Sequence, residues 1–84
     1  MNNLQSIRDA IDAIDKSLLQ LIAKRLQLAQ DARPHKETVK DAVREEELRT
    51  LWAGEAKESG LSEDFAKELL ECILTESRRI QQNP

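Results

Sequence analysis

The first third of the sequence carries apolar residues at helical spacing over about thirty residues. The positions alternate in steps of three and four, with one cation among them, and we call them the apolar seam: Leu4, Ile7, Ile11, Ile14, Leu18, Leu21, Arg25, Leu28 and Ala32. A stripe of this spacing is typical of a helix that packs lengthwise against another helix. We expect a single helix from about Asn3 to about Arg33.

This helix is too long for a single compact copy of the chain. A helix of about 31 residues is about 46 Å long, whereas a compact chain of 84 residues has a radius of gyration of about 12 Å. The overhanging apolar seam must be covered, and the simplest cover is a second copy of the same chain. The small size agrees, because a short chain gains little stability from its own core. We therefore expect a homodimer.

Composition excludes several other classes of protein. Two Gly and two Pro are too few for a fold with many β-hairpins, and a net charge of −3 argues against a nucleic-acid module. One Cys and one His provide neither an internal disulfide nor a structural zinc site. No apolar run has the length of a signal peptide or a membrane span, so we expect a cytoplasmic protein and no membrane partner.

Two further helices complete an expected all-α domain over residues 1–84. The second helix is expected from about Val39 to Glu58, with Thr38 as its N-cap and Gly60 as the left-handed residue that ends it. The third is expected to follow the N-cap Ser62 and to run to about Gln82, and its apolar face consists of Phe65, Leu69, Leu70, Ile73 and Leu74.

Polar residues interrupt the apolar stripes of these helices. Arg25 occupies a seam position, and Lys36 follows 11 residues later, about three helical turns, so both point one way in a regular helix. One face of the second helix carries Asp41, Arg44, Glu45, Leu48 and Trp52, and a row on the third carries Ile73, Ser77 and Gln81. Because a buried cation is costly unless it meets an anion, the sequence predicts a pocket for a small polyanion.

Each of these residues also has a purely structural interpretation. Arg25 taken alone could form a structural salt bridge or set the register in which the seam packs against its partner helix. The charged residues 41–45 fit a solvated first helical turn with local ion pairs, and Ser77 and Gln81 fit a fraying helix end. These alternatives stay open at the level of single residues.

Read together, the positions resemble the all-helical class of chorismate mutases over residues 4–82. The similar stretches are residues 7–15 (IRDAIDAID), 21–25 (LIAKR) with Lys36, 39–45 (VKDAVRE), and the pair Ser77 and Gln81. The resemblance implies an intertwined homodimer that converts chorismate to prephenate in aromatic amino-acid biosynthesis. This intramolecular Claisen rearrangement uses no cofactor and no metal. It requires a dicarboxylate held in a reactive conformation, and donors at the ether oxygen where negative charge develops.

The resemblance also implies a role for each site residue. Arg25 and Arg8 would bind carboxylates, Lys36 and Gln81 would donate to the ether oxygen, and Glu45 with the chain around Asp41 would accept from the ring hydroxyl. Arg44 and Ser77 would complete the polar wall. Arg8 precedes Arg25 by 17 residues, about 25 Å along a helix, so Arg8 would have to come from the partner subunit.

Three features depart from the family pattern: a short connector at 37–40, Pro34 two residues before Lys36, and Arg78 in place of an apolar wall residue. Pro34 disfavours helix at Arg33, and Arg78 either extends outward or alters the pocket. Other functions on the same scaffold are isochorismate-pyruvate lyase and aminodeoxychorismate mutase. A helical dimerisation module without catalysis is the alternative from a different class.

Overall fold

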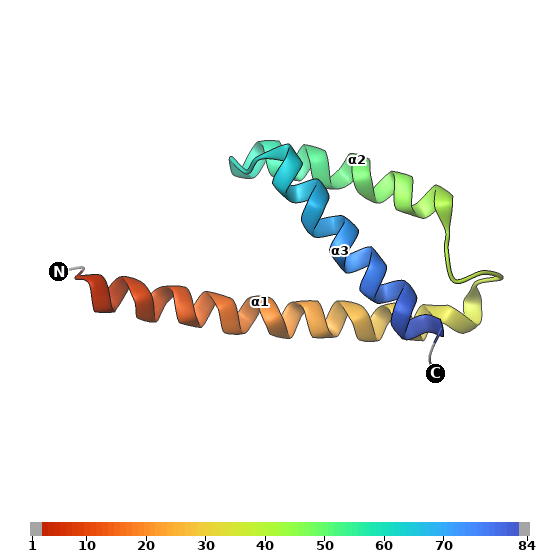
Figure 1. The fold of residues 1–84 in the computed structure, drawn as a ribbon, viewed down its shortest axis with the longest axis horizontal. Helices are drawn as coiled ribbons and strands as arrows, with labels where there is room; N and C mark the ends of the chain where they lie inside the picture. Colours follow the sequence, from red (N-terminus) through yellow and green to blue (C-terminus); the bar gives the residue numbers. More distant parts are fainter. Residues whose placement is uncertain (1–2, 83–84) are drawn as a thin grey trace.

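The structure, a computed structural model, describes residues 3–82 and contains three α-helices (Figure 1). The elements are α1 (Leu4–Ala32), the short 3-10 helix η1 (Arg33–His35), α2 (Ala42–Ser59) and α3 (Glu63–Gln82). The expected all-α class with a very long first helix is confirmed. The first and last two residues of the expected domain lie outside the described range. Within that range no helix is both long and apolar enough to cross a membrane.

Helix α1 extends well beyond the rest of the chain. Its N-terminal half projects away from α2 and α3, and its C-terminal part meets the end of α3 (Figure 1). None of its residues is buried, and the radius of gyration is 15.8 Å, against about 12 Å for a compact chain of this length. The expected overhang is confirmed, and the apolar seam is left uncovered in a single protomer. That a second copy of the chain covers this seam stays a prediction.

Pro34 ends the first helix. Because Pro34 offers no backbone N–H and disfavours helix before it, α1 stops at Ala32 and one 3-10 turn follows. Lys36 is then extended (φ −121°, ψ 143°), with its backbone N–H donating to the carbonyl of Arg33 at 3.2 Å. The expected end of the helix is confirmed to within a residue.

The expected start of the second helix at Val39 is wrong by three residues. Asp41 is the N-cap, and its carboxylate accepts from the backbone N–H of Arg44 at 3.0 Å. The hydroxyl of Thr38, expected to cap this helix, instead donates to the carbonyl of Lys40 at 2.6 Å. The connector is therefore longer than the sequence indicated, because Asp41 satisfies the open N–H groups one turn later.

Helices α2 and α3 pack as an antiparallel pair around a small core. Leu48, Leu70 and Leu74 are buried in it, with Trp52 packed against them. Of the expected apolar face of α3, Phe65 and Leu69 are exposed instead of buried. As expected, Ser62 caps α3, accepting from the N–H of Phe65 at 3.2 Å.

Gly60 allows the turn between these helices, and replacing it by alanine is expected to destabilise the protein by about 1 kcal/mol. Its φ is 73°, a left-handed conformation that costs an L side chain energy, although nothing lies within 4 Å of an added Cβ. Gly54→Ala, in the interior of α2 and equally uncrowded, is the matched control and is expected to be neutral or stabilising. Urea unfolding at fixed protomer concentration measures both, and equal effects would contradict the role of Gly60.

Candidate functional site

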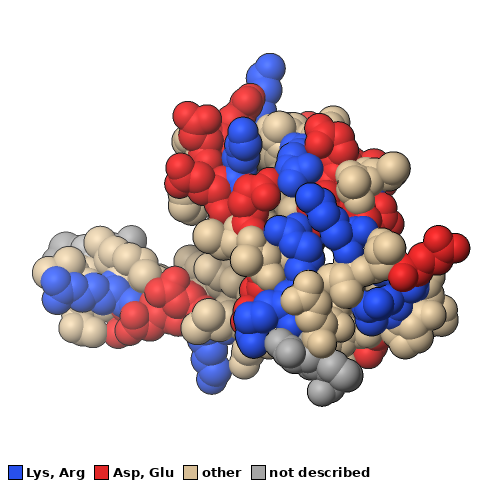
Figure 2. Space-filling view, turned by 45° about the vertical axis from the view of Figure 1, so that its right-hand side comes forward, with Lys and Arg blue, Asp and Glu red and all other residues tan. Residues whose placement is uncertain are grey.

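A cavity of about 200 Å³ opens where the C-terminal part of α1, the connector, the start of α2 and the end of α3 meet. Its lining includes seven of the expected site residues, namely Arg25, Lys36, Asp41, Arg44, Glu45, Ser77 and Gln81, together with Arg78. Lys and Arg side chains gather around a hollow on the face shown in Figure 2. Four cationic and two anionic side chains line the cavity, so it has a positive surplus in a chain whose net charge is −3.

Lys36 joins the connector to the end of α3. Its ammonium donates to the carbonyl of Val39 at 2.7 Å and to Oε1 of Gln81 at 3.0 Å. An ammonium has three donors. Among the described residues only two acceptors meet that of Lys36, so its third N–H can donate to a ligand. With its oxygen facing Lys36, Gln81 has its amide NH₂ available to donate. The cationic donor of Lys36 and the neutral donor of Gln81 thus lie side by side in the cavity.

Arg25 is a half-buried cation without a protein partner in the described part of the chain. Burial lowers the pKa of Arg25, and the like charge of Arg44 lowers it further. Both effects disfavour the charged guanidinium, and a bound anion would favour it. The salt-bridge interpretation of Arg25 is not supported within residues 3–82.

Two buried polar atoms of the cavity wall lack hydrogen bonds among the described residues. They are Oε1 of Glu45 and Oγ of Ser77, and each residue is only 5% exposed. Buried polar groups in proteins almost always have a partner. Both residues line the cavity, so their polar groups are candidates for contact with a ligand.

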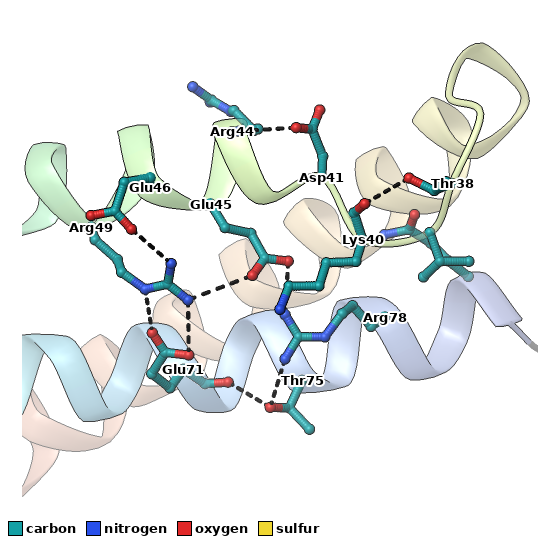
Figure 3. A network of polar contacts seen from close by, with 12 residues as sticks. Thr38, Lys40, Asp41, Arg44, Glu45, Glu46, Arg49, Glu71, Thr75 and Arg78 are labelled. Carbon is teal, nitrogen blue, oxygen red and sulfur yellow. Dashed lines mark hydrogen bonds and ion pairs between the residues drawn. The ribbon is translucent and has the colours of Figure 1, made fainter.

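Glu45 lies between two guanidinium groups (Figure 3). Its Oε2 accepts from Nη1 of Arg78 at 2.7 Å, and its Oε1 lies 3.6 Å from Nη2 of Arg49. Arg49 also donates to Glu71 of α3 at 2.8 Å, and this hydrogen bond holds the pKa of the Glu71 carboxyl below its usual range. The buried carboxylate is thus compensated by cations from both helices of the pair.

The sequence left the direction of Arg78 open, and the structure places it on the cavity wall. The available signal was the row Leu70, Leu74, Arg78, which continues the buried face of α3 at steps of four. Its pairing with Glu45, 33 positions away, has no local signal in the sequence.

Asp41 and Arg44 stand at the exposed mouth of the cavity. Asp41 is occupied as the N-cap of α2, and the guanidinium of Arg44 pairs with Glu47 at 3.3 Å. Within one protomer these two residues therefore stabilise the start of α2 while facing the cavity.

Arg8 lies apart from the other expected residues. It is exposed on the N-terminal half of α1 and does not line the cavity. The described residues also include no group of three or more His, Cys, Asp or Glu side chains placed to hold a metal ion.

Comparison with known proteins finds similarity over most of the chain. The chain is 33% identical over 81 residues to the T-protein of Haemophilus influenzae, a match that covers 92% of this chain and 22% of that protein. The chain therefore spans about a fifth of the length of this relative. The family described as chorismate mutase type II matches residues 7–82, which include every expected site residue. The chain belongs to the chorismate mutase type II family.

Proposed function

We propose that this chain catalyses the family's isomerisation of chorismate to prephenate, in aromatic amino-acid biosynthesis, and binds its substrate in the cavity between the three helices. The observation that carries this proposal is Arg25, a half-buried guanidinium with no partner in the described chain, in a cavity with surplus positive charge. A dianionic substrate supplies the missing countercharge. The cytoplasmic location expected from the sequence stays a prediction.

The lining suits a rearrangement that needs no nucleophile. An intramolecular Claisen rearrangement breaks a carbon–oxygen ether bond as a carbon–carbon bond forms, and negative charge develops at the ether oxygen. Lys36 and Gln81, whose side chains lie 3.0 Å apart, provide fixed donors for that oxygen. Fixed donors in a water-poor site stabilise such charge strongly, and Arg25 holds a carboxylate so that the substrate stays folded.

The remaining polar wall fits the ring hydroxyl of the substrate. Oε1 of Glu45 is a buried acceptor without a hydrogen bond, and Oγ of Ser77 is a buried hydroxyl in the same state. A substrate hydroxyl satisfies the first by donating to it, and a substrate oxygen satisfies the second by accepting from it.

A homodimer with intertwined first helices completes this proposal. The uncovered seam of α1 supports it, because exposed large apolar residues such as Ile7, Ile11 and Ile14 form a continuous row. Arg8 stands on the same half of α1. When α1 of a second copy covers the seam, its Arg8 is carried toward the first protomer and adds a second carboxylate contact to the cavity.

The proposed activity predicts saturable loss of chorismate absorbance near neutral pH with no added metal or cofactor. Isochorismate and 4-amino-4-deoxychorismate, assayed in parallel, test the lyase and the amino-substrate mutase. A dicarboxylate transition-state analogue is expected to raise the melting temperature with concentration, since it binds only the folded protein. No conversion of any of the three compounds and no shift at millimolar analogue would contradict the proposal and favour the dimerisation module.

A further inference from the structure

The charge of Glu45 is already balanced before any ligand binds. Its Oε2 is bound by Arg78 at 2.7 Å, and Arg49 lies 3.6 Å from its Oε1. We propose that Arg78 is a specificity-determining residue: by neutralising Glu45 it makes this carboxylate accept a neutral hydroxyl and excludes a ligand that carries an ammonium at the same place. This inference rests on the proposed function and adds the residue that selects the substrate.

The carboxylate of Glu45, which lines the cavity, defines where selection takes place. Its Oε1 has no hydrogen bond in the described chain and lies 3.6 Å from Nη2 of Arg49, so a ligand group that hydrogen-bonds to this carboxylate comes next to the guanidinium groups of Arg49 and Arg78. Both a hydroxyl and an ammonium can donate there. Hydrogen bonding alone therefore does not distinguish the two groups, and the surrounding charge determines which of them binds better.

Besides Glu45 itself, the two nearest charges to that position are both positive, namely the guanidinium groups of Arg78 and Arg49, and the carboxylates of Glu46 and Glu71 pair with Arg49. A group hydrogen-bonded to Oε1 lies within about 8 Å of the guanidinium groups of Arg78 and Arg49, closer than the distance over which physiological salt screens charges. Arg25 and Lys36 line the same cavity and add two further cations. An ammonium meets this field with its own positive charge, whereas a hydroxyl donates the same hydrogen bond without that repulsion.

Of the two arginines beside Glu45, Arg78 makes the closer contact with it. Arg49 divides its donors among Glu46 and Glu71, and only its longer contact of 3.6 Å reaches Glu45. Arg78 makes the single short ion pair to the carboxylate, and its other contact is a 3.5 Å hydrogen bond to the hydroxyl of Thr75. Removing the charge of Arg78 therefore leaves Glu45 with only its longer, shared contact to Arg49 and makes the surroundings of this carboxylate less repulsive to a cationic group.

The test compares chorismate with 4-amino-4-deoxychorismate, its analogue with an amino group at the ring hydroxyl position. Wild type is expected to favour chorismate in kcat/KM by about 100-fold or more. Arg78→Gln keeps a donor to Glu45 but removes the charge, and is expected to reduce this ratio by about tenfold or more. Arg78→Lys restores the charge and is expected to restore most of the ratio, which a purely structural role of Arg78 would not produce.

Lys67→Gln is the matched control, because it removes one positive charge from the same helix at an exposed position outside the cavity. Its ratio is expected to equal that of wild type. An unchanged ratio in Arg78→Gln would overturn the inference while chorismate turnover still supports the proposed function. A wild type that converts the two compounds within tenfold of each other would overturn it without any variant.

Discussion

Lys36→Met is expected to lower kcat by about 10²–10³-fold, the usual cost of removing one donor from a developing oxyanion. The ammonium of Lys36 holds Gln81 at 3.0 Å and has one donor left for the ether oxygen. Methionine fills a similar volume without donors, so the ether oxygen loses one contact directly and the amide of Gln81 loses its anchor. Steady-state kinetics with chorismate measure the effect. Because the lost contact forms mainly in the transition state, kcat should fall more than KM rises.

Lys57→Met is the control for this substitution. Lys57 lies in the last turn of α2, is exposed and does not line the cavity, so its replacement removes the same charge at a distance from the chemistry. Its kcat is expected to stay within about twofold of wild type. If Lys36→Met retained the activity of this control, Lys36 would not be the donor to the ether oxygen.

Arg8→Ala and Arg25→Ala are each expected to lower kcat/KM by about 100-fold, since a hydrogen bond to a charged group contributes up to about 3 kcal/mol. The two variants are then expected to rescue one another when unfolded together and refolded. Random pairing makes about half of the dimers mixed, and one of the two sites in each mixed dimer has both arginines, so about a quarter of wild-type activity returns. The rescue follows only if Arg8 acts across the dimer interface.

A second mixture provides the control for the rescue. Arg25 and Lys36 line the same cavity of one protomer, so Arg25→Ala refolded with Lys36→Met forms no intact site and should stay inactive. A lack of rescue in the first mixture, with dimers present by analytical ultracentrifugation, would contradict the proposed role of Arg8. Rescue in both mixtures would show that the cavity itself is assembled from two chains.

The sequence predicted the helices because each has a strong local signal. The alternating steps of the apolar seam determine α1, and Gly60 and Ser62 mark the turn before α3. The start of α2 was misplaced because Thr38 and Asp41 are both good N-caps, and periodicity does not choose between them. The choice depends on which side chain reaches an open N–H, and only Asp41 does so.

The residues that line the cavity were largely predictable as a group, but their contacts were not. The spacing of Arg25 and Lys36 predicted that both point one way on a regular helix; the helix ends at Ala32 and Lys36 is extended, yet the two residues do line one cavity. The hydrogen bond between Lys36 and Gln81 joins residues 45 positions apart, and the pair of Arg78 with Glu45 joins residues 33 apart. Such pairs depend on how α3 crosses the other two helices, and no pattern within a single helix contains that information.

The continuous helix α1 has a consequence for how this chain tolerates insertions and deletions. Arg8 and Arg25 stand on one uninterrupted helix, so their separation is fixed by backbone hydrogen bonds and not by a loop. One residue inserted between them would turn everything on its N-terminal side by about 100° and shift it by about 1.5 Å, which turns the seam away from the direction it now faces. The connector after Lys36 and the turn at Gly60 are not helical, so a change of length there does not rotate a helical face in this way.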